Sequence, residues 1–386
     1  NTSVIKESAS RNNKQVIFFK TDEKGVILSG GNFEILDKDG KSIGKIDGKF
    51  KDEGKFLAGS EGLPLPNLTE GEEYTLRETD PPFGYGLASD IKFTVSKTKE
   101  DQMVLMVDGK SSIKTTALDS DTNDHISKPD SDVTINDTVK YQNLIPGKEY
   151  EMEGKLMDKG ANKPMMDDNG KEITAKSKFK ASDSGKGSVV ITFKFSGKTL
   201  EGKTTVAFEI LKKDGKEVAI HHDINDVDQS VVFPKVKTTA LDSDTNDHIS
   251  KPDKDITIND TVKYENLLPG KEYEMEGTLI DKASGKPMTD DNGKVITAKS
   301  KFKASDTGNG SVVITFKFSG KTLEGKTTVA FETLKKEGKE VAIHHDINDV
   351  DQSVVFPKIK TTALDSDTKD HIANADSDVT INDTVK

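Results

Sequence analysis

Cysteine is absent from all 386 positions of the chain. Disulfides and thiolate metal sites therefore cannot stiffen its domains, and a protein of this composition outside the cell needs another kind of reinforcement. Long apolar runs are absent too, and the opening NTSVIKESAS lacks the charged and apolar regions of a signal peptide. We therefore expect a mature or excised segment without a membrane span.

Positive charge is in deficit: the formal net charge is −11, and Lys is interspersed with Asp and Glu without forming a basic patch. Binding to nucleic acid needs clustered positive charge, so we expect no nucleic-acid partner. Hydrophobic and charged residues each make up 32% of the chain, a balance typical of small globular units with much solvated surface. The length predicts about three domains.

An internal repeat sets the domain organisation. The string KTTALDSDT begins at Lys114, Lys237 and Lys360, so the period is 123 residues in both intervals (237 − 114 and 360 − 237). The third copy stops at Lys386, after TINDTVK. The predicted domains are 1–111, which lacks the repeat, then 112–234, 235–357 and the truncated start of a third repeat, 358–386.

Apolar and polar residues alternate inside each repeat. In GSVVITFKF, the side chains of Val189, Ile191 and Phe193 share one face, and this period of two predicts β-strands. Turns rich in Gly and Asp separate such strands, and no stretch keeps a helical period over three turns. The first 111 residues have the same character. We therefore predict an all-β protein with one sandwich per repeat and a smaller sandwich before them.

Each full repeat carries a Thr pair near its start and a Gln near its end, which could form a covalent pair. Gln229 lies 114 positions after Thr115, and Gln352 lies 114 positions after Thr238 (229 − 115 and 352 − 238). Each Gln ends the string HHDINDVDQ, which is identical in the two repeats.

The motifs KTTALDSDT, INDTVKY, VAFE and HHDINDVDQ, in this order and twice over, resemble the VaFE repeat domains of Gram-positive surface adhesins. The resemblance covers residues 112–357 and implies an immunoglobulin-like sandwich with an autocatalytic Thr–Gln ester bond between its first and last strands. Matched motif by motif, it implies bonds from Thr115 to Gln229 and from Thr238 to Gln352. The assisting residues that it implies are a histidine and two acids in each repeat: His221, Asp137 and Glu209, then His344, Asp260 and Glu332.

These residue types suit the reaction. A Thr hydroxyl is a weak nucleophile that needs a base such as imidazole. A carboxamide is a poor electrophile, and buried carboxylic acids can stabilise its oxygen and protonate the departing ammonia. Each domain would react once, so we expect no enzyme in the turnover sense and no cofactor or metal. The second Thr of each pair, Thr116 or Thr239, stays open as the nucleophile because strand register cannot be read to one residue.

Simpler interpretations of two motifs also stay open. The HH pairs could be exposed polar residues, or HHD could bind zinc, although adjacent strand residues face opposite sides. DSDTND places Asp119, Asp121 and Asn123 like the first ligands of a calcium loop, but Asp124 and Asp130 stand where that loop needs Gly and Glu. A weak calcium ion that stiffens the chain and a solvated acidic turn are both compatible with this motif.

Residues 16–108 resemble the Cna B-type domain of collagen-binding adhesins and pilins, through VIFFKTDEKGVILSGGNFEI and YTLRETDPPFGY. The resemblance implies an isopeptide bond in which Lys20 is the nucleophile and Glu78 the proton shuttle. The last strand, MVLMVDG, offers Asp108 as the partner of Lys20, so water would leave instead of ammonia. An ordinary salt bridge between these residues is the alternative.

The two resemblances imply a stalk of tandem immunoglobulin-like sandwiches, arranged as a rod, in an extracellular adhesin anchored to the cell wall of a Gram-positive bacterium. Anchoring would use a C-terminal signal that lies outside these residues. A host matrix or cell-surface ligand would bind other parts of the protein, which also lie outside them. A host-ligand-binding module and a calcium-stiffened rod without cross-links are the alternatives. The third copy retains Thr361 and Asp383 but lacks the Glu, His and Gln, so we expect no ester bond within it.

Overall fold

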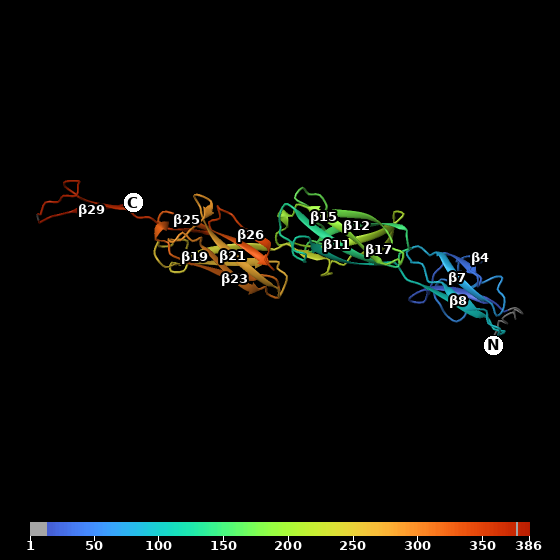
Figure 1. The fold of residues 1–386 in the computed structure, drawn as a ribbon. Helices are drawn as coiled ribbons and strands as arrows, with labels where there is room; N and C mark the ends of the chain where they lie inside the picture. The colour runs from blue at the N-terminus through green and yellow to red at the C-terminus, as the bar shows by residue number, and fades with distance from the viewer. Residues whose placement is uncertain (1–13, 376) are drawn as a thin grey trace, which may run out of the picture. The chain divides into compact units, whose positions relative to one another are not determined.

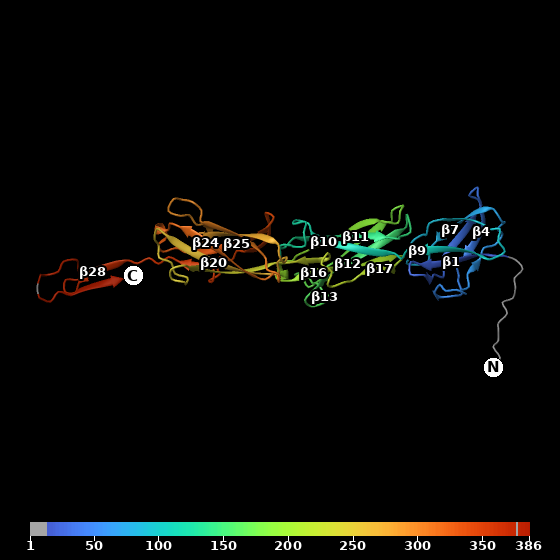
Figure 2. The ribbon, with the colours of Figure 1, turned by 90° about the horizontal axis from the view of Figure 1, so that it is seen from below.

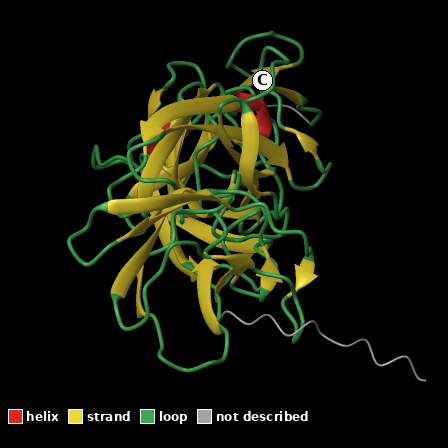
Figure 3. Ribbon diagram, turned by 90° about the vertical axis from the view of Figure 1, so that its right-hand side faces the viewer, coloured by secondary structure: helices red, strands yellow, loops and turns green. Residues whose placement is uncertain are grey.

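The computed structural model describes residues 14–375 and 377–386, which are almost entirely strands and loops (Figure 1 and Figure 3). Two short 3-10 helices, η1 (Lys198–Leu200) and η2 (Lys321–Leu323), occupy equivalent places in the two repeats. The prediction of an all-β protein is confirmed. No helix among the described residues is long and apolar enough to span a membrane. The opening NTSVIKESAS lies outside them.

The first domain is a sandwich of two sheets. One sheet has the order β5-β2-β1-β6, with β9 also paired to β1, and the other has the order β4-β3-β7-β8. Phe18 of β1 packs edge-on against Phe33 of β3 with ring centroids 4.9 Å apart, so the core lies between the sheets. The strands are β1 (Val16–Asp22), β2 (Val26–Ile27), β3 (Asn32–Leu36), β4 (Ser42–Asp47), β5 (Gly54–Lys55), β6 (Leu63–Pro64), β7 (Glu73–Asp80), β8 (Ile91–Thr94) and β9 (Gln102–Asp108).

Strands β1 and β9 begin and end this domain and run parallel to each other. Lys20 lies opposite Met106 in their register. Because side chains alternate along a strand, Asp108, two positions further on, faces the same side of the sheet as Met106. The first and last strands thus bring Lys20 and Asp108 onto one face.

Each full repeat consists of a three-stranded and a six-stranded sheet. In the first repeat the orders are β10-β11-β15 and β13-β12-β16-β17, with β14 on β12 and β18 on β16. The second repeat has the same arrangement, β19-β20-β24 and β22-β21-β25-β26, with β23 on β21 and β27 on β25. Figure 2 shows the long antiparallel pair β20 and β24 side by side.

The strand bounds of the two repeats correspond closely. The first has β10 (Ser112–Asp119), β11 (Val133–Gln142), β12 (Glu149–Asp158), β13 (Lys163–Pro164), β14 (Thr174–Lys180), β15 (Gly187–Phe195), β16 (Thr204–Lys213), β17 (Lys216–His221) and β18 (Ser230–Val232). The second has β19 (Lys235–Asp242), β20 (Ile256–Glu265), β21 (Glu272–Asp281), β22 (Lys286–Pro287), β23 (Thr297–Lys303), β24 (Gly310–Phe318), β25 (Thr327–Lys336), β26 (Lys339–His344) and β27 (Ser353–Val355).

The predicted alternation in GSVVITFKF is present in β15. Ile191 and Phe193 are buried, whereas Val190, Thr192 and Lys194, which alternate with them, are exposed. A Cβ on Gly154 of β12 would lie 2.4 Å from the Ile191 Cδ1 atom, so the two sheets approach closely here because this position is glycine.

The third copy forms one antiparallel hairpin of β28 (Thr361–Asp365) and β29 (Ile381–Val385). Ala363 pairs with Asp383 across it, and the side chains of Thr361 and Asp383 are exposed. Residues 358–386 contain no Glu or Gln, and their histidine, His371, is the repeat equivalent of His125 and His248 and not of His221, so the predicted site is incomplete here.

Candidate cross-linking sites

The first repeat gathers four predicted site residues in its core. Thr115 on β10, Asp137 on β11, Glu209 on β16 and Gln229 just before β18 are each at most 1% exposed. The Thr115 hydroxyl is hydrogen-bonded to Asp137 Oδ1, and Gln229 Nε2 donates to Glu209 Oε2. Four polar side chains from separate segments of the chain therefore meet in a buried interior.

Strand alternation separates the two threonines of the pair. Ile113, Thr115 and Ala117 are buried on one face of β10, whereas Thr116 on the other face is half-buried. The second repeat has the same arrangement, with Thr238 6% exposed and hydrogen-bonded to Asp260. The structure thus brings the first Thr of each pair to the acids.

Asp137 and Glu209 are close enough for each carboxyl group to influence the pKa of the other. Asp137 Oδ2 and Glu209 Oε1 are buried and receive no hydrogen bond from a protein donor. A proton on one of the two acids would supply the donor that a pair of carboxylates lacks. Burial, together with the neighbouring Asp137 charge, raises the pKa of Glu209 to about 11. Burial also raises the pKa of Asp137 above its usual range. The site therefore holds a neutral carboxylic acid at neutral pH.

His221 reaches the site from the neighbouring strand. It pairs with Glu209 across β16 and β17, and the charge of its imidazole tends to lower the pKa of Asp137. Its Nε2 atom lies 2.8 Å from Asp226 Oδ2. The hydroxyl of Thr115 is bonded to Asp137 and not to His221, so the acid is the group in direct contact with the nucleophile.

Asp226 was not among the predicted site residues. Its Oδ1 atom accepts the backbone N–H of Asp228, and its backbone carbonyl accepts the Ser230 hydroxyl. It therefore holds both the His221 ring and the turn that leads to Gln229. The string HHDINDVDQ contains this aspartate, but four acidic or amide residues in it are equally plausible partners before the turn is known.

The two histidines of each HH pair lie on opposite faces of the strand. His222 stacks on Phe208 with ring centroids 4.9 Å apart, and His345 stacks in the same way on Phe331. Among the described residues no group of three or more His, Cys, Asp or Glu lies close enough to hold a metal ion. The zinc interpretation therefore gains no support from the geometry.

The second repeat reproduces the whole arrangement. Asp260, Glu332 and Gln352 are fully buried, and Gln352 Nε2 donates to Glu332. Burial, together with the Asp260 charge, raises the pKa of Glu332 well above its usual range. His344 Nε2 lies 3.0 Å from Asp349 Oδ2, as in the first repeat.

The first domain contains a different buried trio. Lys20 on β1 is in contact with Glu78 on β7, and its Nζ atom lies 2.7 Å from Asp108 Oδ2 on β9; none of the three side chains is exposed. Burial lowers the pKa of Lys20 to about 8 and raises that of Asp108. The backbone N–H of Ala88 donates to Glu78 Oε2 at 2.8 Å and holds that carboxyl in place. Amine and acids are thus poised to exchange protons.

A family model for the T-Q ester bond containing domain matches residues 111–233, 234–356 and 357–386. The chain belongs to the T-Q ester bond domain family. The sequence resemblance to ester-bond adhesin repeats is thereby confirmed, and so is the resemblance of the first domain, because a prealbumin-like fold domain model of the SpaA type matches residues 14–110. No curated protein sequence matches this chain.

The solved structures that resemble the chain include three bacterial surface proteins, each with weak similarity. A bacterial adhesin from Mobiluncus mulieris containing intramolecular disulfide, isopeptide and ester bond cross-links is 15% identical over 66% of this chain and 87% of that one, with a TM-score of 0.28. The major pilin subunit of Bacillus cereus is 17% identical over 85% and 91%, with a TM-score of 0.25. The major pilin SpaD of Corynebacterium diphtheriae is 13% identical over 90% and 96%, with a TM-score of 0.25.

The acidic DSDTND loop of the first T-Q domain uses its leading aspartate to close a turn. Asp119 is buried; its Oδ1 atom accepts the backbone N–H of Thr122 at 2.8 Å and its Oδ2 atom accepts the Ser127 hydroxyl at 2.8 Å. Protein donors therefore reach both oxygens of the residue that would be the first calcium ligand. This geometry favours a structural turn over a cation site.

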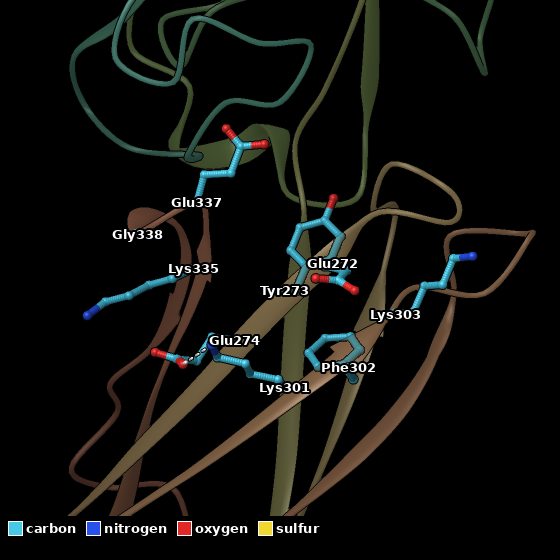
Figure 4. A pocket seen from close by; sticks show the side chains of 9 residues that line it. All are labelled: Glu272, Tyr273, Glu274, Lys301, Phe302, Lys303, Lys335, Glu337 and Gly338. Atoms are coloured by element: carbon cyan, nitrogen blue, oxygen red, sulfur yellow. Dashed lines mark ion pairs between the residues drawn. The ribbon is translucent and has the colours of Figure 1, made fainter.

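A surface pocket of about 620 Å³ in the second T-Q domain lies apart from these residues (Figure 4). Tyr273 and Phe302 line it together with charged residues of both signs, and Lys301 lies 4.0 Å from Glu274 across it. None of the proposed cross-linking residues lines this pocket.

Proposed function

We propose that the chain is a structural segment of an extracellular surface protein, in which three domains are each reinforced by one autocatalytic intramolecular bond. The bonds are esters from Thr115 to Gln229 and from Thr238 to Gln352, and an isopeptide from Lys20 to Asp108. The observation that carries this proposal is the contact series in each T-Q domain: hydroxyl, acid, acid and carboxamide, in one buried site.

The contact series suggests how the proton travels in the ester reaction. The Thr115 oxygen attacks the side-chain carbonyl carbon of Gln229 while its proton passes to Asp137. A proton passes on from Asp137 to Glu209, and Glu209 delivers a proton to the nitrogen of Gln229. The carbon–nitrogen bond breaks and ammonia leaves, so atoms and charges balance. Folding brings together a hydroxyl and a carboxamide that are 114 residues apart in sequence, and this proximity accounts for much of the acceleration of ester formation.

His221 has an electrostatic role in this scheme. Its imidazole faces Glu209 across two paired strands and favours the ionised form of Asp137, the form that accepts the hydroxyl proton. Asp226 holds the imidazole ring in place through Nε2. The histidine is thus supporting the base instead of acting as the atom that takes the proton directly.

The first domain would form an amide by the same logic. A buried amine whose pKa is lowered is more readily neutral, and neutral amine attacks the Asp108 carboxyl carbon. Glu78, in contact with Lys20, carries a proton to the departing oxygen, and water leaves. Each of the three reactions happens once and consumes its own side chains, so the protein is not an enzyme in the turnover sense and uses no cofactor.

The biological role that fits this design is that of a stalk. Its cross-links would resist tensile force and proteolysis in a chain that has no cysteine for disulfides. We place it at the surface of a Gram-positive bacterium, anchored to the cell wall, where parts of the protein outside this segment would contact a host ligand. Membership in the T-Q ester bond domain family supports the ester-bonded part of this proposal.

Intact mass of the denatured chain tests the cross-links. The proposal requires a deficit equal to two ammonias and one water relative to the sequence. Gln229→Ala and Gln352→Ala chains should each show one ammonia fewer in that deficit. A chain with the full sequence mass would refute the proposal for all three bonds.

A further inference from the structure

The loop of residues 119–133 packs with the domain that follows it. The second compact unit of the chain takes in this loop and residues 196–204 together with residues 231–386, although the loop belongs to the first T-Q domain in sequence. Ile126 in this loop is 0% exposed and joins an apolar core whose other buried members all lie between Val236 and Phe356. A side chain of the first T-Q domain therefore completes the core of the second.

The equivalent residue in the second T-Q domain provides an internal comparison. Ile249 occupies the same DHIS motif, 123 positions later, but is 50% exposed. Because the two loops have nearly the same sequence and belong to the same fold, the domain's own residues do not explain the burial of Ile126. The difference corresponds to the presence of a following domain.

Polar contacts surround this apolar anchor. Lys336, at the turn between β25 and β26, is only 8% exposed and its Nζ atom lies 2.6 Å from Asp124 Oδ2. Lys339 Nζ donates to the Thr122 carbonyl at 3.0 Å. Lys128 and Glu340 form a further ion pair in the same place.

The second T-Q domain again shows what happens without this partner. Asp247, the equivalent of Asp124, accepts hydrogen bonds from Thr245 Oγ1 and from the backbone N–H of Ile249, both within its own loop. Lys213, the equivalent of Lys336 in the first T-Q domain, forms an ion pair with the adjacent Asp214, and Lys336 likewise pairs with the adjacent Glu337 at 2.9 Å. Lys336 therefore keeps its local partner and gains Asp124 of the preceding T-Q domain as a second one.

We infer that the 119–133 loop is a docking element through which one T-Q domain binds the next, with Ile126 as the apolar anchor and Asp124 as the acceptor for Lys336. The partner that fits it is a T-Q domain with a lysine-bearing turn of the type KKEGKE between its β25-like and β26-like strands. Figure 4 shows this turn at Glu337 and Gly338, beside the pocket. The docking is independent of the cross-links, since none of the bond-forming residues contributes to it.

Hydrogen exchange on the full 386-residue chain tests the inference, with each loop variant matched by its repeat equivalent. Ile126→Ser and Asp124→Asn should speed exchange of the backbone amides in the 336–340 turn by at least about tenfold, because that turn loses its cover. Ile249→Ser and Asp247→Asn should leave exchange in this turn unchanged. Lys336→Ala should speed exchange in the 120–128 loop, whereas Lys213→Ala should not.

The inference is overturned if the 336–340 turn exchanges at the same rate in Asp124→Asn and in the parent chain. It is also overturned if Ile126→Ser and Ile249→Ser accelerate the turn equally. If Ile126→Ser unfolds the first T-Q domain, exchange will rise throughout residues 134–230, and the Asp124→Asn and Lys336→Ala results then decide the question.

Discussion

Asp226 Oδ2 lies 2.8 Å from Nε2 of His221, while Oδ1 of the same carboxylate accepts the backbone N–H of Asp228, next to Gln229. One side chain thus connects the imidazole to the turn that presents the carboxamide. The second T-Q domain repeats the relationship through Asp349.

Replacing Asp226 by Asn should slow ester formation in the first T-Q domain by at least about tenfold, because a neutral amide forms a weaker hydrogen bond to the His221 ring than a carboxylate does. Asn can still accept the Asp228 N–H, so the turn should persist. The measurement is a time course of ammonia loss by intact mass after refolding. The second domain of the same chain is the control, and Asp349→Asn should reverse the roles; equal rates in both domains would contradict the prediction.

Glu209→Gln should abolish the ester in the first T-Q domain. Gln keeps the size and hydrogen-bonding capacity of Glu but cannot pass a proton between Asp137 and the leaving nitrogen, so the rate should fall by at least about 100-fold. The denatured chain should be heavier than expected from the Glu-to-Gln change alone by one ammonia. Thr116→Ala serves as the control and should keep the full ammonia loss, since Thr116 faces away from the acids.

The buried acid should make an unbonded T-Q domain less stable as pH rises. In a Gln229→Ala chain, folded Glu209 keeps its proton up to a pKa of about 11, whereas the unfolded residue loses it near 4.5. Unfolding between these limits releases a proton, so the free energy of unfolding should decrease by at most about 1.4 kcal/mol per pH unit.

Calorimetry of that chain at pH 5, 7 and 9 should show a falling melting temperature for the first T-Q domain. The double variant Gln229→Ala, Glu209→Gln should lose most of this dependence, because its Gln does not titrate. A melting temperature that does not fall with pH in the single variant would show that Glu209 is already ionised in the folded domain.

Asp108→Asn should leave the mass of the cross-linked product unchanged. Attack of Lys20 on Asn expels ammonia where attack on Asp expels water, and the remaining amide is identical. The Asp108→Ala chain, by contrast, should show no mass deficit from the first domain, because it has no carboxyl group for Lys20 to attack. If the Asn chain retains its full sequence mass in that domain, the residue is only an ion-pair partner of Lys20.

Strand alternation predicted the all-β fold, whereas the candidate site residues were predicted from the resemblance of the motifs to a known family. Ile113 and Ala117, two positions either side of Thr115, already mark the buried face of β10, so the choice between Thr115 and Thr116 was present in the pattern. The hydrogen bond between Asp226 and His221 could not be predicted from the sequence. Several acids in the same turn could reach the histidine, and only the geometry of the turn decides which one does.

The burial of Ile126 could not be predicted for a different reason. Its motif is the same as that of Ile249, yet one side chain is fully buried and the other is half exposed. Local sequence carries no information about which copy has a neighbour packed on it. Nearly identical loop sequences therefore differ in burial because of the contacts that each loop makes with a neighbouring repeat.

The positions of Thr115 and Gln229 also determine how far the chain can stretch. Without a bond, the 114 residue steps from Thr115 to Gln229 could extend by on the order of 400 Å when the domain unfolds under load, at about 3.5 Å per residue. With the bond closed, that stored length is inaccessible, and only short connections such as the one from Gln229 to Thr238 can lengthen. A cell held by such a tether would keep a nearly constant distance from its anchor point as the force on it grows.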